Sequence, residues 1–133
     1  MMNDKGLILK YPIWLTWATL IAWMSLIFFL SHQSTLPSAP GGLLDTIFKK
    51  LAHALAYAVL MGLWRLALNS LGLYGAKNLL LALIFTLLYA ISDEWHQTFI
   101  PGRNGQLADV LVDFSGALLA LIVIRRFNRK SSI

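Results

Sequence analysis

The sequence contains no cysteine and few charged residues. The lack of cysteine excludes disulfides, thiolate metal ligands and a thiol nucleophile. Only 13% of the 133 residues are charged and 58% are hydrophobic, whereas about a quarter of a soluble domain is charged. This balance excludes an ordinary soluble domain, and the length allows one domain.

The net charge of +5 does not by itself indicate a nucleic-acid-binding protein. The basic residues lie mostly at the ends of long apolar runs, where Lys and Arg anchor and orient membrane helices. We therefore expect contacts with membrane lipids and none with nucleic acid.

Four apolar segments predict an all-α bundle of four transmembrane helices, because each is close to the roughly 20 residues that cross a bilayer. These segments cover about residues 12–30, 51–70, 77–97 and 107–127. Joining segments rich in Pro, Gly and polar residues are typical of loops and lie at 31–45, 69–77 and 100–105. The first run is longer than the roughly 7–15 residues of a signal-peptide core, so we interpret it as a span.

The distribution of basic residues predicts that both termini lie in the cytoplasm. With four spans, the termini share one side with the 69–77 loop, and that side holds Lys5, Lys10, Lys77, Arg125, Arg126, Arg129 and Lys130. The other side holds Lys49, Lys50 and Arg103. Because Lys and Arg are enriched on the cytoplasmic side, we predict a multi-pass protein of the cytoplasmic (inner) membrane.

Residues 92–113 hold most of the acidic side chains, between two apolar flanks. A charge deep in a bilayer costs about 2.5–3.5 kcal/mol on insertion scales, so such residues are usually functional or paired. Helical spacing places Lys50, His53 and Tyr57 on one face, at i, i+3 and i+7. Asp109 and Asp113 share another face with the small residues Gly116 and Ala120, which would allow close packing of that helix.

We predict that these groups meet in a polar pocket at the extracytoplasmic end of the bundle. The expected ligand-binding residues are Lys50, His53, Tyr57, Asp93, Glu94, Gln97, Arg103, Asp109 and Asp113. Further candidates at the rim are Gln33, Ser34 and His96.

Taken singly, many of these residues have a plainer interpretation. Lys50 could extend toward the interface, Tyr57 could pack between helices, and Asp109 could stabilise a helix N-terminus. Arg103 could form a structural ion pair with Asp93, Glu94 or Asp109. Since neighbouring residues point in different directions, we expect one of Asp93 and Glu94 to face the bundle and the other to meet water, a loop or a lipid headgroup. Asp113 lies roughly 6 Å deeper than Asp109, which favours a buried partner or a functional role.

The same residues resemble the VanZ-like family of membrane proteins. The resemblance rests on Lys50-x-x-His53-x-x-x-Tyr57, on the string DExxQxFxPGR that runs from Asp93 to Arg103, and on Asp109 and Gly116. It covers about residues 12–127 and includes the SHQS sequence that ends at Ser34. Lys49 stands where the family often has Asp, and Asp113 stands where it commonly has Asn. The resemblance implies a small helical membrane protein. The founding member of the family is linked to resistance to teicoplanin, a glycopeptide antibiotic.

Three functions remain open at this point. The first is recognition of a polar or anionic lipid-linked group, such as a cell-wall precursor or a lipid-tailed glycopeptide, at the outer leaflet. The second is an acid–base or metal-assisted enzyme acting on such a precursor, with Asp93, Glu94 and His53 as candidate catalytic residues. The third is a small transporter, disfavoured because the charges cluster at one end. We predict no metal or cofactor, since no spacing such as HExxH is present, and we consider a homodimer possible for so small a bundle.

Overall fold

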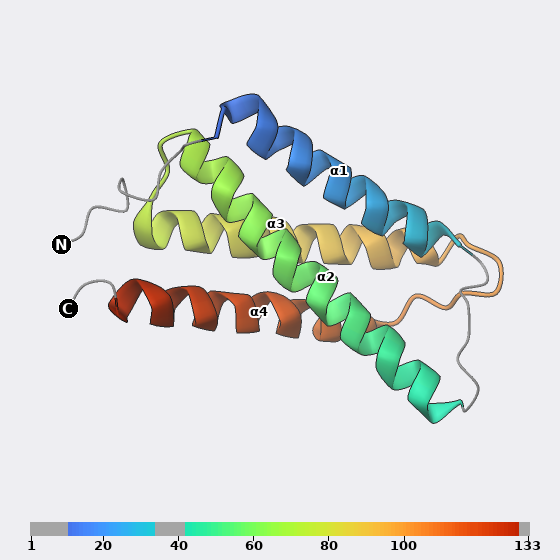
Figure 1. The fold of residues 1–133 in the computed structure, drawn as a ribbon. Coiled ribbons are helices and arrows are strands. Elements are labelled where there is room, and N and C mark those ends of the chain that lie inside the picture. Colours follow the sequence, from blue (N-terminus) through green and yellow to red (C-terminus); the bar gives the residue numbers. More distant parts are fainter. Residues whose placement is uncertain (1–10, 34–41, 131–133) are drawn as a thin grey trace.

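The computed structural model describes residues 11–33 and 42–130, and this part of the chain forms helices without any strand. The helices are α1 (Ile13–His32), α2 (Leu43–Ser70), α3 (Gly75–Gln97) and α4 (Leu107–Lys130) (Figure 1). All 4 are long and apolar enough to cross a membrane. The prediction of an all-α chain with four membrane-spanning helices is therefore confirmed.

The helices end where the sequence supplies residues that break them. Pro12 precedes the first turn of α1, with the extended backbone expected of proline. At the end of α2, Gly72 has a φ of 82°, and the N–H groups of Gly72 and Leu73 donate to the carbonyls of Asn69 and Leu68. This is a Schellman motif, which needs a residue that tolerates positive φ. The turn directs α3 back along α2.

Helix α2 begins at Leu43, well before the predicted start near residue 51. Residues 43–50 combine apolar and polar side chains. A search for continuous apolar runs therefore begins the span only near residue 51. The added turns contain an ion pair between Lys49 Nζ and Asp45 Oδ2 at 2.6 Å, with the i,i+4 spacing that supports a helix. The extension also presents exposed apolar side chains, among them Leu43, Leu44 and Phe48.

Two small clusters of apolar side chains hold the helices together. One is centred on Leu20, Tyr57 and Leu60, and the other on Met61, Ala82 and Ala117. Most other large apolar side chains point outward, as expected where the solvent is lipid rather than water. Helices α2 and α4 approach very closely at Gly116. A Cβ atom added there would collide with the backbone carbonyl of Ala54, so only glycine fits at this position. The predicted close approach at Gly116 is confirmed.

One end of the bundle is formed by the last turns of α1 and α3 and the first turns of α2 and α4 (Figure 1). We call it the polar end. At the opposite end, the side-chain amide of the buried Asn78 donates to the carbonyls of Arg65 and Leu73 and to Asn69 Oδ1. These bonds tie the α2–α3 turn to both helices.

Candidate functional site

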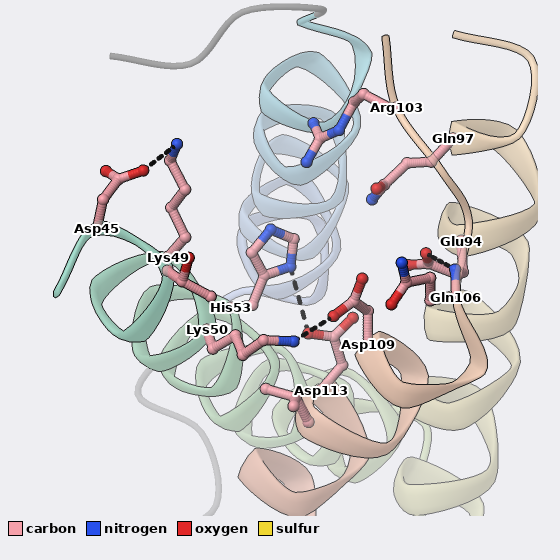
Figure 2. Close-up of a pocket in the computed structure, with 12 residues that line it drawn as sticks. Asp45, Lys49, Lys50, His53, Glu94, Gln97, Arg103, Gln106, Asp109 and Asp113 are labelled. Carbon is pink, nitrogen blue, oxygen red and sulfur yellow. Dashed lines mark hydrogen bonds and ion pairs between the residues drawn. The ribbon is translucent and has the colours of Figure 1, made fainter. Parts of the chain in front are cut away.

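A cavity of about 370 Å³ lies at the polar end, between α2, α3, α4 and the connection formed by residues 98–106 (Figure 2). We call it the polar pocket. It is lined by Asp45, Thr46, Lys49, Lys50, His53, Glu94, Gln97, Arg103, Gln106, Asp109, Val112 and Asp113. Most of these residues carry a polar or charged side chain, although the helices around them are apolar.

Two ion pairs join α2 to α4 in the pocket. Lys50 Nζ lies 2.7 Å from Asp109 Oδ1, and one helical turn deeper His53 Nδ1 lies 3.2 Å from Asp113 Oδ1. The outer pair is partly exposed, whereas the Asp113 side chain is only 1% exposed. Both pairs depend on the close contact of α2 and α4 at Gly116. Asp113 therefore has a partner on α2, although the His53 side chain is 28% exposed rather than buried as expected.

Asp93 lies deeper and does not line the pocket. Its Oδ2 accepts hydrogen bonds from Ser31 Oγ at 2.8 Å and from Tyr57 Oη at 3.1 Å. The carboxyl group thus connects α3 to α1 and α2 below the floor of the pocket. Two of the predicted ligand-binding residues, Asp93 and Tyr57, therefore do not line the polar pocket, and Tyr57 lines a neighbouring cavity instead.

Glu94 is also buried, and it meets the connection that follows α3, whereas Asp93 faces the bundle; the expectation that one of the two acids would face the bundle and the other would meet water, a loop or a headgroup is confirmed. Asp93 is 3% exposed and Glu94 is 5% exposed. The reason is that the connection after α3 folds back over the helix, so that the backbone N–H of Gln106 donates to Glu94 Oε1 at 2.6 Å. Gly105 makes this contact possible, since a Cβ there would collide with the carbonyl of Glu94 and with Thr98.

Arg103 binds backbone carbonyls rather than the acids that the sequence suggested. Its Nη1 donates to the carbonyl oxygens of Ser31 and Gln33, at 3.0 and 3.3 Å. Cations are favourable at this position, because the last carbonyls of a helix carry a partial negative charge. Within the described chain it forms no ion pair with Asp93, Glu94 or Asp109. Its guanidinium group also lines the pocket above His53 (Figure 2).

The predicted rim residues lie elsewhere. His96 faces α1, where its Nε2 lies 3.1 Å from His32 Nδ1 and its ring packs against Phe28. Gln33 follows the end of α1, and its side chain donates to the carbonyl of Phe29 in the last turn of that helix. Ser34 is outside the described residues.

Four polar lining residues were missed from the sequence, namely Asp45, Thr46, Lys49 and Gln106. The i,i+4 spacing of Asp45 and Lys49 was the available signal for the first turns of α2. Gln106 enters the site through the backbone N–H that binds Glu94, which no side-chain pattern reveals.

Several buried polar atoms in the pocket wall have no hydrogen-bond partner within the described structure. They are the acceptor Glu94 Oε2, the donor Gln97 Nε2 and the carboxylate oxygen Asp113 Oδ2, whereas Asp113 Oδ1 lies against His53 Nδ1. The side chains are more than nine-tenths buried, and all three line the polar pocket. Buried polar groups are nearly always hydrogen-bonded, and each of these atoms exposes less than 1 Å², so a polar molecule in the pocket would reach them only after a side-chain rotation. Such a molecule would need both hydrogen-bond donors and acceptors.

The described residues contain no group of three or more His, Asp or Glu side chains arranged to hold a metal ion. In the pocket, His53 is paired with Asp113 and Lys50 with Asp109 across α2 and α4. The site is best described by its charges and hydrogen bonds.

The apolar four-helix bundle is typical of a multi-pass membrane protein, and its polar pocket lies at one end of the bundle. The comparison with known families assigns it further. Residues 16–128 match the family model described as VanZ/LLP1, and the chain belongs to this family. No curated protein and no solved structure matches the chain.

Proposed function

We propose that this protein binds a lipid-linked group with an anionic, hydrogen-bonding head at the outer leaflet of the cytoplasmic membrane. The observation that carries the proposal is a set of buried atoms without a hydrogen-bond partner, Glu94 Oε2, Gln97 Nε2 and Asp113 Oδ2, whose residues line a cavity together with Lys50. Buried polar groups of this kind are stable when a bound molecule completes their hydrogen bonds.

The cations of the pocket suit a phosphate or carboxylate. Lys50 and Arg103 line opposite parts of the cavity, with His53 between them in the close-up view (Figure 2). Hydrogen bonds between charged donors and anionic oxygens are short and about twice as strong as neutral ones. Cell-wall precursors and lipid-tailed glycopeptides combine such anionic groups with sugar and amide groups. We therefore place the protein in the cell-envelope or glycopeptide response.

A charge-removal experiment tests this function. The protein is placed in phosphatidylcholine nanodiscs, and binding of a polyprenyl-phosphate-linked N-acetylglucosamine is measured for Lys50→Met and for the matched control Lys130→Met. Loss of one charge-assisted hydrogen bond should weaken binding about tenfold in Lys50→Met, corresponding to about 1.4 kcal/mol. The control removes the same charge from the far end of α4 and should bind normally.

Equal binding by both variants, or no binding by the unmodified protein, would reject the function. A lipid-tailed glycopeptide serves as the second ligand in the same assay, because its head differs while its anionic and amide groups are shared. If the bound precursor is cleaved during the assay, the acid–base alternative centred on His53 and Glu94 replaces simple recognition.

A further inference from the structure

A second cavity, of about 320 Å³, lies between α1 and α2 beside the polar pocket. We call it the lateral cleft. Ile27, Leu30, Ala52 and Ala56 supply an apolar wall. The side chains of Lys49 and His53 line both the cleft and the polar pocket, so they form a shared boundary between the two cavities.

The lateral cleft arises because α1 and α2 diverge toward the polar end (Figure 1). The two helices are joined where Trp17 packs edge-on against Trp64 and where Trp23 Nε1 donates to the carbonyl of Ala56 at 3.0 Å. Beyond Ala56 they separate, and Leu30 and Ala52 are exposed at the opening. Since these helices are apolar enough to span a membrane, we expect the opening to face lipid hydrocarbon rather than water.

The lateral cleft affects the free energy of binding a lipid whose head group enters the polar pocket. A lipid chain gains no hydrophobic free energy by leaving the bilayer for an apolar protein surface, because the two environments are equally apolar. It would lose free energy, however, if the head pulled the chain across the charged rim of the pocket. An apolar passage next to the pocket lets the head bind while the chain stays in hydrocarbon.

The charges of the polar pocket restrict the head group. Lys50 and Arg103 favour an anionic group, whereas Glu94 and Asp113 present acceptor oxygens that a purely anionic head would leave unpaired. We propose that a single lipid occupies both cavities. Its head carries one anionic group and several hydrogen-bond donors and lies in the polar pocket, and the first part of its chain lies in the lateral cleft. This inference rests on the proposed function and adds the position of the lipid chain.

Photo-crosslinking tests the position of the chain. The probe is polyprenyl-phosphate-linked N-acetylglucosamine with a diazirine on the isoprene unit nearest the phosphate, presented in phosphatidylcholine nanodiscs. Crosslinks should map by mass spectrometry to the peptides that contain Ala52, Ala56 and Leu30. Crosslinks spread over the exposed faces of all helices would overturn the inference.

A cleft-filling variant gives a second and independent test. Ala52→Trp places an indole in the cleft, whereas Leu55→Trp adds the same group at a position that is 68% exposed and lines neither cavity. We expect Ala52→Trp to weaken binding of the lipid probe about tenfold and Leu55→Trp to leave it unchanged. Binding of the soluble head, N-acetylglucosamine 1-phosphate, should be the same in both variants.

The two assays separate the inference from the proposed function. If Ala52→Trp binds the lipid probe as the control does, the lipid chain does not occupy the lateral cleft. The proposed binding of the head group in the polar pocket, tested by Lys50→Met, is unaffected by that result. If neither the lipid probe nor the soluble head depends on Lys50, the proposed function fails and the inference fails with it.

Discussion

Among single residues, Asp93 and Lys50 represent two different kinds of polar contact. Asp93 is buried, and two hydroxyl groups from other helices donate to it. The Lys50–Asp109 pair is partly exposed, with side-chain exposures of 43% and 34%, and exposed ion pairs contribute only about 0–1 kcal/mol to stability. Asp93 therefore holds the helices together, whereas Lys50 can be replaced without unfolding the protein. This difference makes Lys50 the better residue for a test of binding.

Tyr57→Phe tests the structural role of the Asp93 contacts. Removing the hydroxyl takes one of the two donors from a buried carboxyl group, and we expect a loss of about 1 kcal/mol, typical of hydrogen bonds between membrane helices. The measurement is equilibrium unfolding in mixed micelles. Tyr11→Phe is the matched control, because Tyr11 is 63% exposed. Equal stabilities of the two variants would show that the Tyr57 hydroxyl does not support the fold.

Among the helices, the crossing of α2 and α4 determines the geometry of the polar pocket. Lys50 and His53 lie on one helix and Asp109 and Asp113 on the other, so a change in helix separation moves both ion pairs at once. The contact of Gly116 with the backbone of Ala54 keeps this separation small. A glycine in the middle of a helix normally destabilises it by about 0.5–1 kcal/mol, so its presence here is explained by the close approach.

Gly116→Ala should therefore destabilise the protein, although alanine is the better helix former. The added methyl group would force α2 and α4 apart, and overpacking of this kind costs about 1–3 kcal/mol. Gly62→Ala in α2 is the control, because a Cβ there meets nothing within 4 Å, and it should be neutral or slightly stabilising. Unfolding in mixed micelles and binding of the lipid-linked sugar are measured together. An unchanged Gly116→Ala protein would contradict the proposed role of the crossing.

For the whole molecule, the arrangement of charges sets its position in the membrane. The polar pocket gathers acids and bases at one end, and Arg125, Arg126, Arg129 and Lys130 follow the apolar part of α4 at the other end. Positive residues are retained on the cytoplasmic side of a membrane, so we predict that the polar end faces outward.

Single introduced cysteines can test this orientation, since the chain has none of its own. Asn104→Cys lies in the connection at the polar end, and Lys130→Cys lies at the end of α4, with both positions exposed. A membrane-impermeant maleimide added to spheroplasts should label Asn104→Cys at once and Lys130→Cys only after the membrane is permeabilised. The reverse pattern would mean that the protein is inverted and that the pocket opens to the cytoplasm.

Much of the architecture could be predicted from the sequence because membrane spans depend on local properties. Hydrophobicity and length define the four helices, and glycine and proline mark most of their ends. The spacing of Lys50 and His53, and of Asp109 and Asp113, places each pair on one helix face before any contact is known. The early start of α2 escaped prediction because residues 43–50 are amphipathic rather than apolar.

The contacts between helices were decided only by the tertiary structure. The sequence alone predicted a four-helix membrane protein with ionisable groups near one end, since hydropathy and helical spacing are properties of each segment. It could not assign Arg103 to the carbonyls of α1 or bury both Asp93 and Glu94, because these contacts depend on the path of residues 98–106 over α3. Nor could it show the lateral cleft, which lies where α1 and α2 diverge toward the polar end.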